Sequence, residues 1–179
     1  AFTGEISPAM LREAGCTWVL TGHSERRHVL GESPDFVGKK TAFALEQGFS
    51  VILCIGETLA ERKAGKLNSI LWLQLERGLA GLGPNADSRL AVAYEPVWAI
   101  GTGQTASDED IRMVHTLVRE LLSSLLGSNG IGIQILYGGS VKPDNAKAIL
   151  SLDNVDGLLV GGASLQAQSF ADIVRADLA

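Results

Sequence analysis

The sequence is poor in aromatic residues and in cysteine, and it lacks long apolar runs. Aromatic residues make up 6% of the 179 residues. No apolar run reaches the roughly 18 residues that a membrane span needs, and the first residues, AFTGEISP, lack the basic and apolar regions of a secretion signal. The two cysteines, Cys16 and Cys54, lie in apolar stretches without metal or disulfide spacing, so we expect both to be small buried residues. We predict a cytoplasmic protein without a membrane segment.

Positive charge is also scarce and scattered. The formal net charge is -5, and lysine and arginine do not cluster, which argues against nucleic acid or an anionic membrane as a partner. Small molecules are therefore the expected partners. With 46% apolar residues, the chain has enough material for one core, and we predict a single domain over residues 1–179.

What the chain does have is a repeated apolar unit. Short runs of Val, Ile and Leu, each ending in Gly or a polar residue, are typical of parallel strands buried on both faces. Amphipathic segments with helix caps separate them, for example after Ser33 and Ser107, and Gly15 and Gly48 indicate helix ends. This alternation predicts an α/β protein. The expected strands cover residues 16–23, 50–57, 90–96, 131–139 and 155–162.

Two α/β architectures could produce this pattern, the doubly wound sheet of dinucleotide-binding proteins and the (β/α)8 barrel. The stretch GTGQTA at 101–106 matches a dinucleotide fingerprint, but five residues separate it from the preceding strand, and no acidic residue ends the next strand. A parallel (β/α)8 barrel accounts for more, because its chemistry lies at the C-terminal ends of several strands. Here those ends supply His23, Glu95, the GGS of 138–140 and the glycine pair of 161–162.

Glu95 draws attention because it is a charge at the end of an apolar strand. The residues after it have a stiff start at Pro96, an apolar tip around Trp98, and a flexible Gly-Thr-Gly end at 101–103. A loop of this composition can close over a site and exclude water, and a desolvated carboxylate is a stronger base. Glu95 is thus a candidate base beneath a lid.

Four motifs then carry a resemblance over essentially the whole chain. TGHSERR, YEPVWAIGTG, LYGGSV and GLLVGGASL, in this order and spacing, resemble the triosephosphate isomerase family. The resemblance implies an enzyme of glycolysis and gluconeogenesis that interconverts dihydroxyacetone phosphate and glyceraldehyde 3-phosphate through an enediol-like intermediate. It further implies a homodimer in the cytoplasm that uses neither metal nor cofactor.

The resemblance also assigns roles to residues. Glu95 would move the proton between neighbouring carbons, and a neutral His23 would donate a hydrogen bond to the substrate oxygens, helped by a helix start at Ser24 that disfavours the imidazolium. Glu25 matches a position near the site and is a possible secondary residue. His28 and His115 are expected to be surface or packing residues. The positions that match the family's phosphate contacts are Gly101, Ser140, Gly161 and Gly162.

The chain is shorter than a whole barrel, which takes about 250 residues. We therefore expect the last five strand-helix units of a parallel barrel, open at both edges, without the first three strands. The family's Asn-x-Lys at the end of its first strand is also expected to be missing, which puts the activity of the chain alone in question. A homo-oligomer or a complementing N-terminal fragment would cover the open core. The alternative function is a non-catalytic, phosphate-binding or self-assembling truncated barrel.

Overall fold

The computed structural model describes residues 3–82, 86–100 and 105–176 and contains one parallel sheet. The strands lie in chain order, so each neighbouring pair is joined by a helical crossover, as in a (β/α) barrel. The parallel α/β prediction is confirmed. The strands are β1 (Trp18–Thr21), β2 (Ser50–Ile55), β3 (Leu90–Tyr94), β4 (Gln134–Tyr137) and β5 (Gly157–Leu158).

The strands are shorter than the apolar runs predicted. The fourth run was expected to begin at residue 131, but residues up to Ile131 belong to a short helix and the strand begins at Gln134. The fifth run forms only a two-residue strand. Apolar side chains beyond these limits pack onto the core from loops, which the sequence pattern does not distinguish from a strand.

Side-chain caps and glycines set the helix ends as expected. Ser33 accepts a hydrogen bond from the amide of Phe36, and Ser107 accepts one from the amide of Asp110. Gly15 and Gly48 follow two of the helices in left-handed conformations, with φ of +81° and +85°. The α-helices are α1 (Pro8–Glu13), α2 (Ser24–His28), α3 (Pro34–Glu46), α4 (Leu59–Lys63), α5 (Leu67–Gly78), α6 (Asp108–Leu126), α7 (Ser128–Ile131), α8 (Pro143–Leu150) and α9 (Ala167–Arg175); the 3-10 helices are η1 (Ala86–Arg89), η2 (Val97–Ala99) and η3 (Gly162–Leu165).

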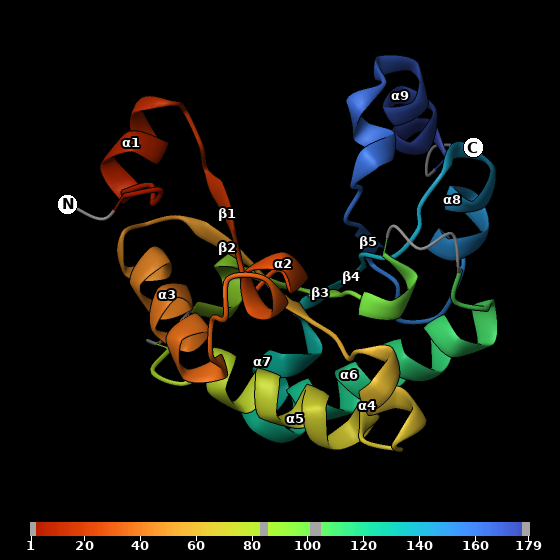
Figure 1. Cartoon of the computed structure of the whole chain (residues 1–179), viewed down its shortest axis with the longest axis horizontal. Coiled ribbons are helices and arrows are strands. Elements are labelled where there is room, and N and C mark those ends of the chain that lie inside the picture. The colour runs from red at the N-terminus through yellow and green to blue at the C-terminus, as the bar shows by residue number, and fades with distance from the viewer. Residues whose placement is uncertain (1–2, 83–85, 101–104, 177–179) are drawn as a thin grey trace.

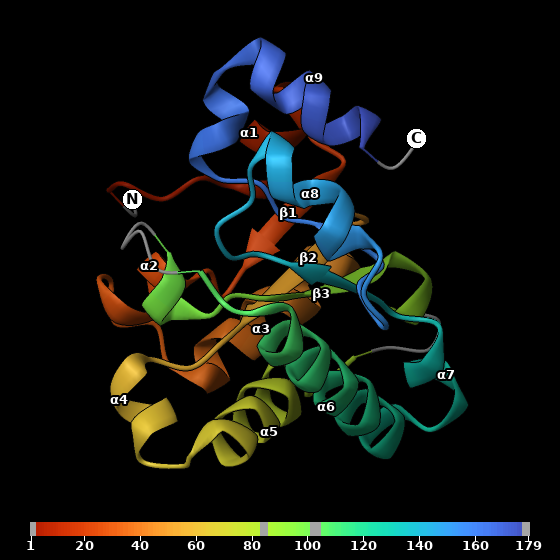
Figure 2. The same cartoon turned by 90° about the vertical axis from the view of Figure 1, so that its right-hand side faces the viewer.

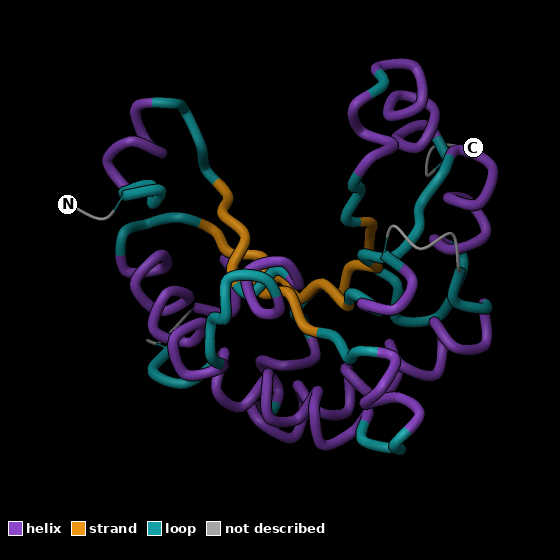
Figure 3. Tube along the Cα trace, in the orientation of Figure 1, coloured by secondary structure: helices purple, strands orange, loops and turns teal. Residues whose placement is uncertain are grey.

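The elements follow an open arc, with α1 at one end and α9 at the other (Figure 1; Figure 3). Helices α3, α5 and α6 lie along the convex side of the sheet, and α5 and α6 pack side by side beneath it (Figure 2). Every residue of β3 is buried. The hydrophobic core therefore lies between the middle strands and these helices, and it holds the strand ends rigidly.

The two edge strands are less covered. Among the described residues, β1 pairs only with β2, and β5 pairs only with β4, so the sheet forms a partial barrel. The side chains of Trp18 and Leu20 on β1 are 46% and 45% exposed, as expected for an open barrel. Cys54 is buried as predicted. The prediction for Cys16 was wrong, because it precedes the edge strand and is exposed there.

Candidate active site

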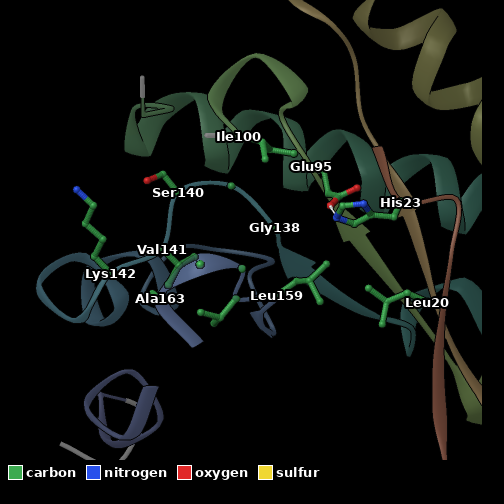
Figure 4. Close-up of a pocket in the computed structure, with 14 residues that line it drawn as sticks. Leu20, His23, Glu95, Ile100, Gly138, Ser140, Val141, Lys142, Leu159 and Ala163 are labelled. Atoms are coloured by element: carbon green, nitrogen blue, oxygen red, sulfur yellow. Dashed lines mark ion pairs between the residues drawn. The ribbon is translucent and has the colours of Figure 1, made fainter. Parts of the chain in front are cut away.

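The C-terminal ends of the strands border one cleft of about 480 Å³. His23 and Glu95 lie at one end of it, and Ser140 lies toward the other (Figure 4). Gly161 and Gly162 also line the cleft. The loops after β1, β3, β4 and β5 supply these residues, so the structure brings together the strand-end candidates that the sequence separates by up to 139 positions.

Glu95 is a buried carboxylate held by three contacts. It follows β3 directly, and its side chain is 3% exposed. Its backbone amide donates to the carbonyl oxygen of Ile55 at 2.7 Å, which extends the ladder between β2 and β3. Its Oε2 accepts a hydrogen bond from the amide of Ser24 at 3.0 Å, and its Oε1 lies 3.0 Å from Nε2 of His23. The carboxylate is thus held at the edge of the cleft with Oε1 facing His23.

His23 caps helix α2, and its contacts fix the position of its proton. Nδ1 accepts a hydrogen bond from the amide of Glu25 at 3.3 Å, so the imidazole carries its proton on Nε2 and points it at Glu95 (Figure 4). The hydrogen bond to Glu95 raises the pKa of His23, against the opposing effect of burial. The sequence predicted the opposite direction from a helix start; α2 has only five residues, and the carboxylate outweighs it.

The other titratable candidates lie outside the cleft. Glu25 is exposed and contributes its backbone amide to His23, while its side chain is not among the cleft residues. His28 is exposed. His115 is fully buried, where its Nδ1 lies 2.8 Å from the carbonyl oxygen of Asn154, which agrees with a packing role.

The glycines of the cleft differ in what surrounds them. A Cβ on Gly161 or Gly162 would meet nothing within 4 Å, so an incoming ligand can approach the backbone there. A Cβ on Gly139 would lie 2.1 Å from the hydroxyl of Tyr137, and one on Gly138 would lie 3.0 Å from Cγ of Glu95. A side chain at Gly138 would therefore crowd the Glu95 side chain, which the sequence motif does not reveal. The helix expected directly after Gly162 is first the short η3, and α9 begins only at Ala167.

Two lysines have specific surroundings. Lys142 is exposed and lines the cleft beside Ser140, and the half-buried Lys40 forms an ion pair with the buried Glu32 at 2.6 Å. Asn145-Ala146-Lys147 does spell Asn-x-Lys, but it lies within α8 and not at a strand end. Asn145 instead accepts from the amide of Lys142 and donates to the carbonyl of Ser140, which fixes this side of the cleft.

The loop after Glu95 begins as the composition predicted. Pro96 precedes η2, and the indole of Trp98 donates a hydrogen bond to Glu57 at 2.8 Å. Ile100 reaches the edge of the cleft (Figure 4). Gly101, a predicted phosphate contact, lies outside the described residues.

Three residues contribute to the site through contacts that the sequence analysis did not predict. The amide of Ser24 holds Glu95, Arg27 reaches back beneath the His23 turn, and Gly56 packs against the backbone of Glu95. A Cβ on Gly56 would lie only 1.7 Å from the backbone oxygen of Glu95. These residues lie in the sequence runs SERR at 24–27 and IGE at 55–57. Neither run shows which backbone groups the residues contact. Within the described ranges no three His, Cys, Asp or Glu side chains gather as metal ligands, and no helix there is long and apolar enough to cross a membrane.

Comparison with known proteins adds independent information. Residues 1–177 match the family described as "Triosephosphate isomerase". A protein of that name from Nitratidesulfovibrio vulgaris strain Miyazaki F is 61% identical over 177 residues, which are 98% of this chain and 70% of the relative. Its counterparts from Lawsonia intracellularis and a Roseiflexus species are 58% and 51% identical over 98% of this chain, or 70% and 69% of those relatives.

Proposed function

Because the chain belongs to the triosephosphate isomerase family, we propose that it interconverts dihydroxyacetone phosphate and glyceraldehyde 3-phosphate. The observation that supports this most is the contact between Glu95 and His23 at 3.0 Å, inside a cleft whose other end is lined by glycine backbone. This places a carboxylate and a hydrogen-bond donor side by side, so that one can face a substrate carbon and the other the oxygen next to it. No observation favours the non-catalytic alternative.

Glu95 is the proposed base. Its carboxylate would take a proton from the carbon next to the substrate carbonyl and return it to the neighbouring carbon, so that the carbonyl moves by one position. The amide of Ser24 orients one oxygen, which leaves the other free to face the substrate once it leaves His23. Burial at 3% exposure keeps water from competing for the proton.

His23 is the proposed electrophile. Its Nε2 proton points into the cleft, where a substrate carbonyl oxygen could replace Glu95 as the acceptor. The hydrogen bond that raises the pKa of His23 would then be lost, which favours a neutral ring during the reaction. A neutral imidazole N-H can stabilise the developing oxyanion, and the backbone amide of Glu25 supports the ring by donating a hydrogen bond to Nδ1.

The far end of the cleft is the proposed phosphate site. Ser140 can contribute its hydroxyl, and the open backbone at Gly161 and Gly162 leaves room for the phosphate oxygens. Gly101 stays a predicted contact. A single domain over residues 1–179, assembly into a homodimer or with a complementing N-terminal fragment, and a cytoplasmic location also remain our proposals.

The test compares Glu95→Gln with Glu25→Gln. The first keeps the shape and the acceptor for Ser24 but removes the base, so we expect turnover of triose phosphates to fall by about 10³- to 10⁴-fold. The second removes an exposed carboxylate beside the site, and turnover should stay within about twofold. Binding of inorganic phosphate, measured by calorimetry, should persist in both variants.

The outcomes separate the functions. Turnover that survives in Glu95→Gln would refute the assignment of the base. Phosphate binding without any turnover by the unmodified chain would favour the phosphate-binding alternative. Turnover of other sugar phosphates, with none of triose phosphates, would show that the chain acts on a different substrate.

A further inference from the structure

Arg27 reaches back beneath the turn that carries His23. Its Nε donates a hydrogen bond to the carbonyl oxygen of Gly22 at 2.7 Å. Its backbone amide donates to the carbonyl oxygen of His23 at 3.1 Å. One residue thus holds the two consecutive carbonyl groups between which the His23 side chain is set.

The other arm of the same guanidinium binds the neighbouring strand. Nη2 donates to the carbonyl oxygen of Cys54 in β2 at 2.9 Å. The ladder between β1 and β2 ends with Thr21 opposite Leu53, so the next pair along would be Gly22 and Cys54. The planar guanidinium spans these two carbonyl groups and takes the place of that next pair.

Gly22 shows independently that the local backbone is adapted to this contact. It has φ of +68°, and a Cβ there would lie 2.5 Å from Nη2 of Arg27 and 2.8 Å from Cγ1 of Val37. A glycine therefore serves both the left-handed turn and the space for the guanidinium.

The contacts continue from this point to the base. Cys54 is followed by Ile55, whose carbonyl oxygen accepts the amide of Glu95. On the other side, His23 is followed by Ser24, whose amide binds the Glu95 carboxylate. The two routes from Arg27 therefore meet at Glu95, and both are short.

We propose that Arg27 is a positioning residue that fixes His23 and Glu95 relative to each other by joining the ends of β1 and β2. The proposal rests on the proposed function for its kinetic consequence, but not for its structural one. Burial lowers the pKa of Arg27, and nearby Cys54 and Glu95 oppose that shift. The guanidinium stays charged at neutral pH, so its electrostatic attraction to Glu95 acts together with the two hydrogen bonds.

The kinetic experiment compares Arg27→Met and Arg27→Lys with the control Arg26→Met. Because small displacements of reacting groups cost rate steeply, we expect kcat to fall by about 10²-fold in Arg27→Met. Lysine keeps the charge but cannot donate to two carbonyls in one plane. The kcat of Arg27→Lys should therefore be about tenfold higher than that of Arg27→Met and still about tenfold below that of the unmodified chain. KM should stay within about threefold, since the phosphate end is untouched.

Arg26 is a matched control because it precedes Arg27 on the same helix and carries the same charge. It forms ion pairs with Glu32 at 2.5 Å and Glu5 at 3.0 Å, away from the end of β2. Its replacement should lower the melting temperature as much as that of Arg27 or more. If kcat nevertheless stays near the unmodified value in Arg26→Met, the loss in Arg27→Met is not a general effect of destabilisation.

A readout without turnover separates this proposal from the proposed function. In the unmodified chain, the ¹⁵N shifts of His23 should show an unprotonated Nδ1 and a protonated Nε2 above the pKa of the ring. Arg27→Lys and Arg27→Met should give a mixture of both tautomers, while Arg26→Met should not. If Arg27→Met does not fold, Arg27→Lys decides.

An unchanged His23 tautomer together with kcat within about twofold in the folded Arg27 variants would overturn the positioning role. Absence of turnover in the unmodified chain would instead count against the proposed function. In that case the ¹⁵N pattern still decides on Arg27.

Discussion

Two buried glutamates end neighbouring strands, and their surroundings differ. Glu57 follows β2 and is fully buried; it accepts hydrogen bonds from Tyr94, from the indole of Trp98 and from Arg62. Glu95 follows β3, is nearly as buried, and has the amide of Ser24, the ring of His23 and the thiol of Cys54 as its polar neighbours. Glu95 lines the cleft, whereas Glu57 is not among the residues that border it.

The difference shows that two similarly buried carboxylates can have very different surroundings, and it is the reason why we propose Glu95 and not Glu57 as the base. Glu57 accepts hydrogen bonds from one cation, Arg62, and from two neutral donors, Tyr94 and Trp98. Arg62 also forms an ion pair with Asp110. The Glu57 carboxylate therefore joins α4, η2 and, through Arg62, α6. Glu95 keeps an oxygen that can exchange His23 for a substrate. A buried acid with spare acceptor capacity beside a cavity is the arrangement that suits a base.

Glu57→Gln should lower the stability of the protein more than Glu95→Gln does. Glu57→Gln removes one of the two carboxylates that pair with Arg62 and leaves Asp110 as the other, so we expect the free energy of unfolding to drop by about 1–3 kcal/mol. Urea unfolding followed by circular dichroism measures this. Among the described residues, Glu95 forms an ion-pair contact with His23 but with no Arg or Lys. Glu95→Gln should therefore change the free energy of unfolding by less than about 1 kcal/mol. Equal losses in the two variants would contradict the distinction.

Two histidines extend the comparison to pH. Burial lowers the pKa of His115 to about 4, although the Asn154 carbonyl opposes the shift. The unfolded chain therefore binds this proton first as the pH falls from about 6.5, and stability should decrease by about 3 kcal/mol by pH 4. His23 acts in the opposite sense: its pKa is raised, so its contribution is present at low pH and is lost as the pH rises through the folded value.

The measurement is the free energy of unfolding at several pH values between 4 and 7 for the unmodified chain and for His115→Gln. The glutamine variant should lose stability less steeply with acid, because the group that titrates is gone. A parallel pair of curves would show that His115 does not control acid stability.

Gly56→Ala should affect the surroundings of both glutamates, because Gly56 lies between Ile55 and Glu57 and touches the backbone of Glu95. The added methyl group would lie 1.7 Å from the Glu95 oxygen, so the end of β3 must shift. We expect a cost of about 1–3 kcal/mol in unfolding free energy and a loss of kcat that exceeds the loss of phosphate binding. Gly132→Ala is a control for the glycine change itself, since Gly132 has φ of -86° and a Cβ there meets nothing within 4 Å. Similar kcat values for the two variants would contradict this reading.

Much of the fold followed from the sequence because its determinants are local. Apolar runs gave the order of the strands, and Ser33, Ser107, Gly15 and Gly48 marked helix ends through hydrogen bonds or φ angles that involve only nearby residues. The strand lengths were overestimated, since a loop residue that packs on the core is as apolar as a strand residue. Cys16 was misplaced because the edge of a sheet cannot be read from one strand alone.

The site shows the same division. The chemical identity of the pair, Glu95 and His23, was evident from residue type at strand ends and from the resemblance of four motifs to a family. The proton position on His23, the direction of its pKa shift, the fully partnered state of Glu57 and the reach of Arg27 to Cys54 were not.

The sequence by itself determined which residues could do chemistry and the order in which strands and helices present them, because hydrophobic periodicity and capping act over a few residues. Only the tertiary structure decided which buried acid is free to react and which cation holds the strand ends together. Those properties depend on contacts between residues 27 to 71 positions apart, such as Arg27 with Cys54 and Ser24 with Glu95, and on the exclusion of water that such contacts produce.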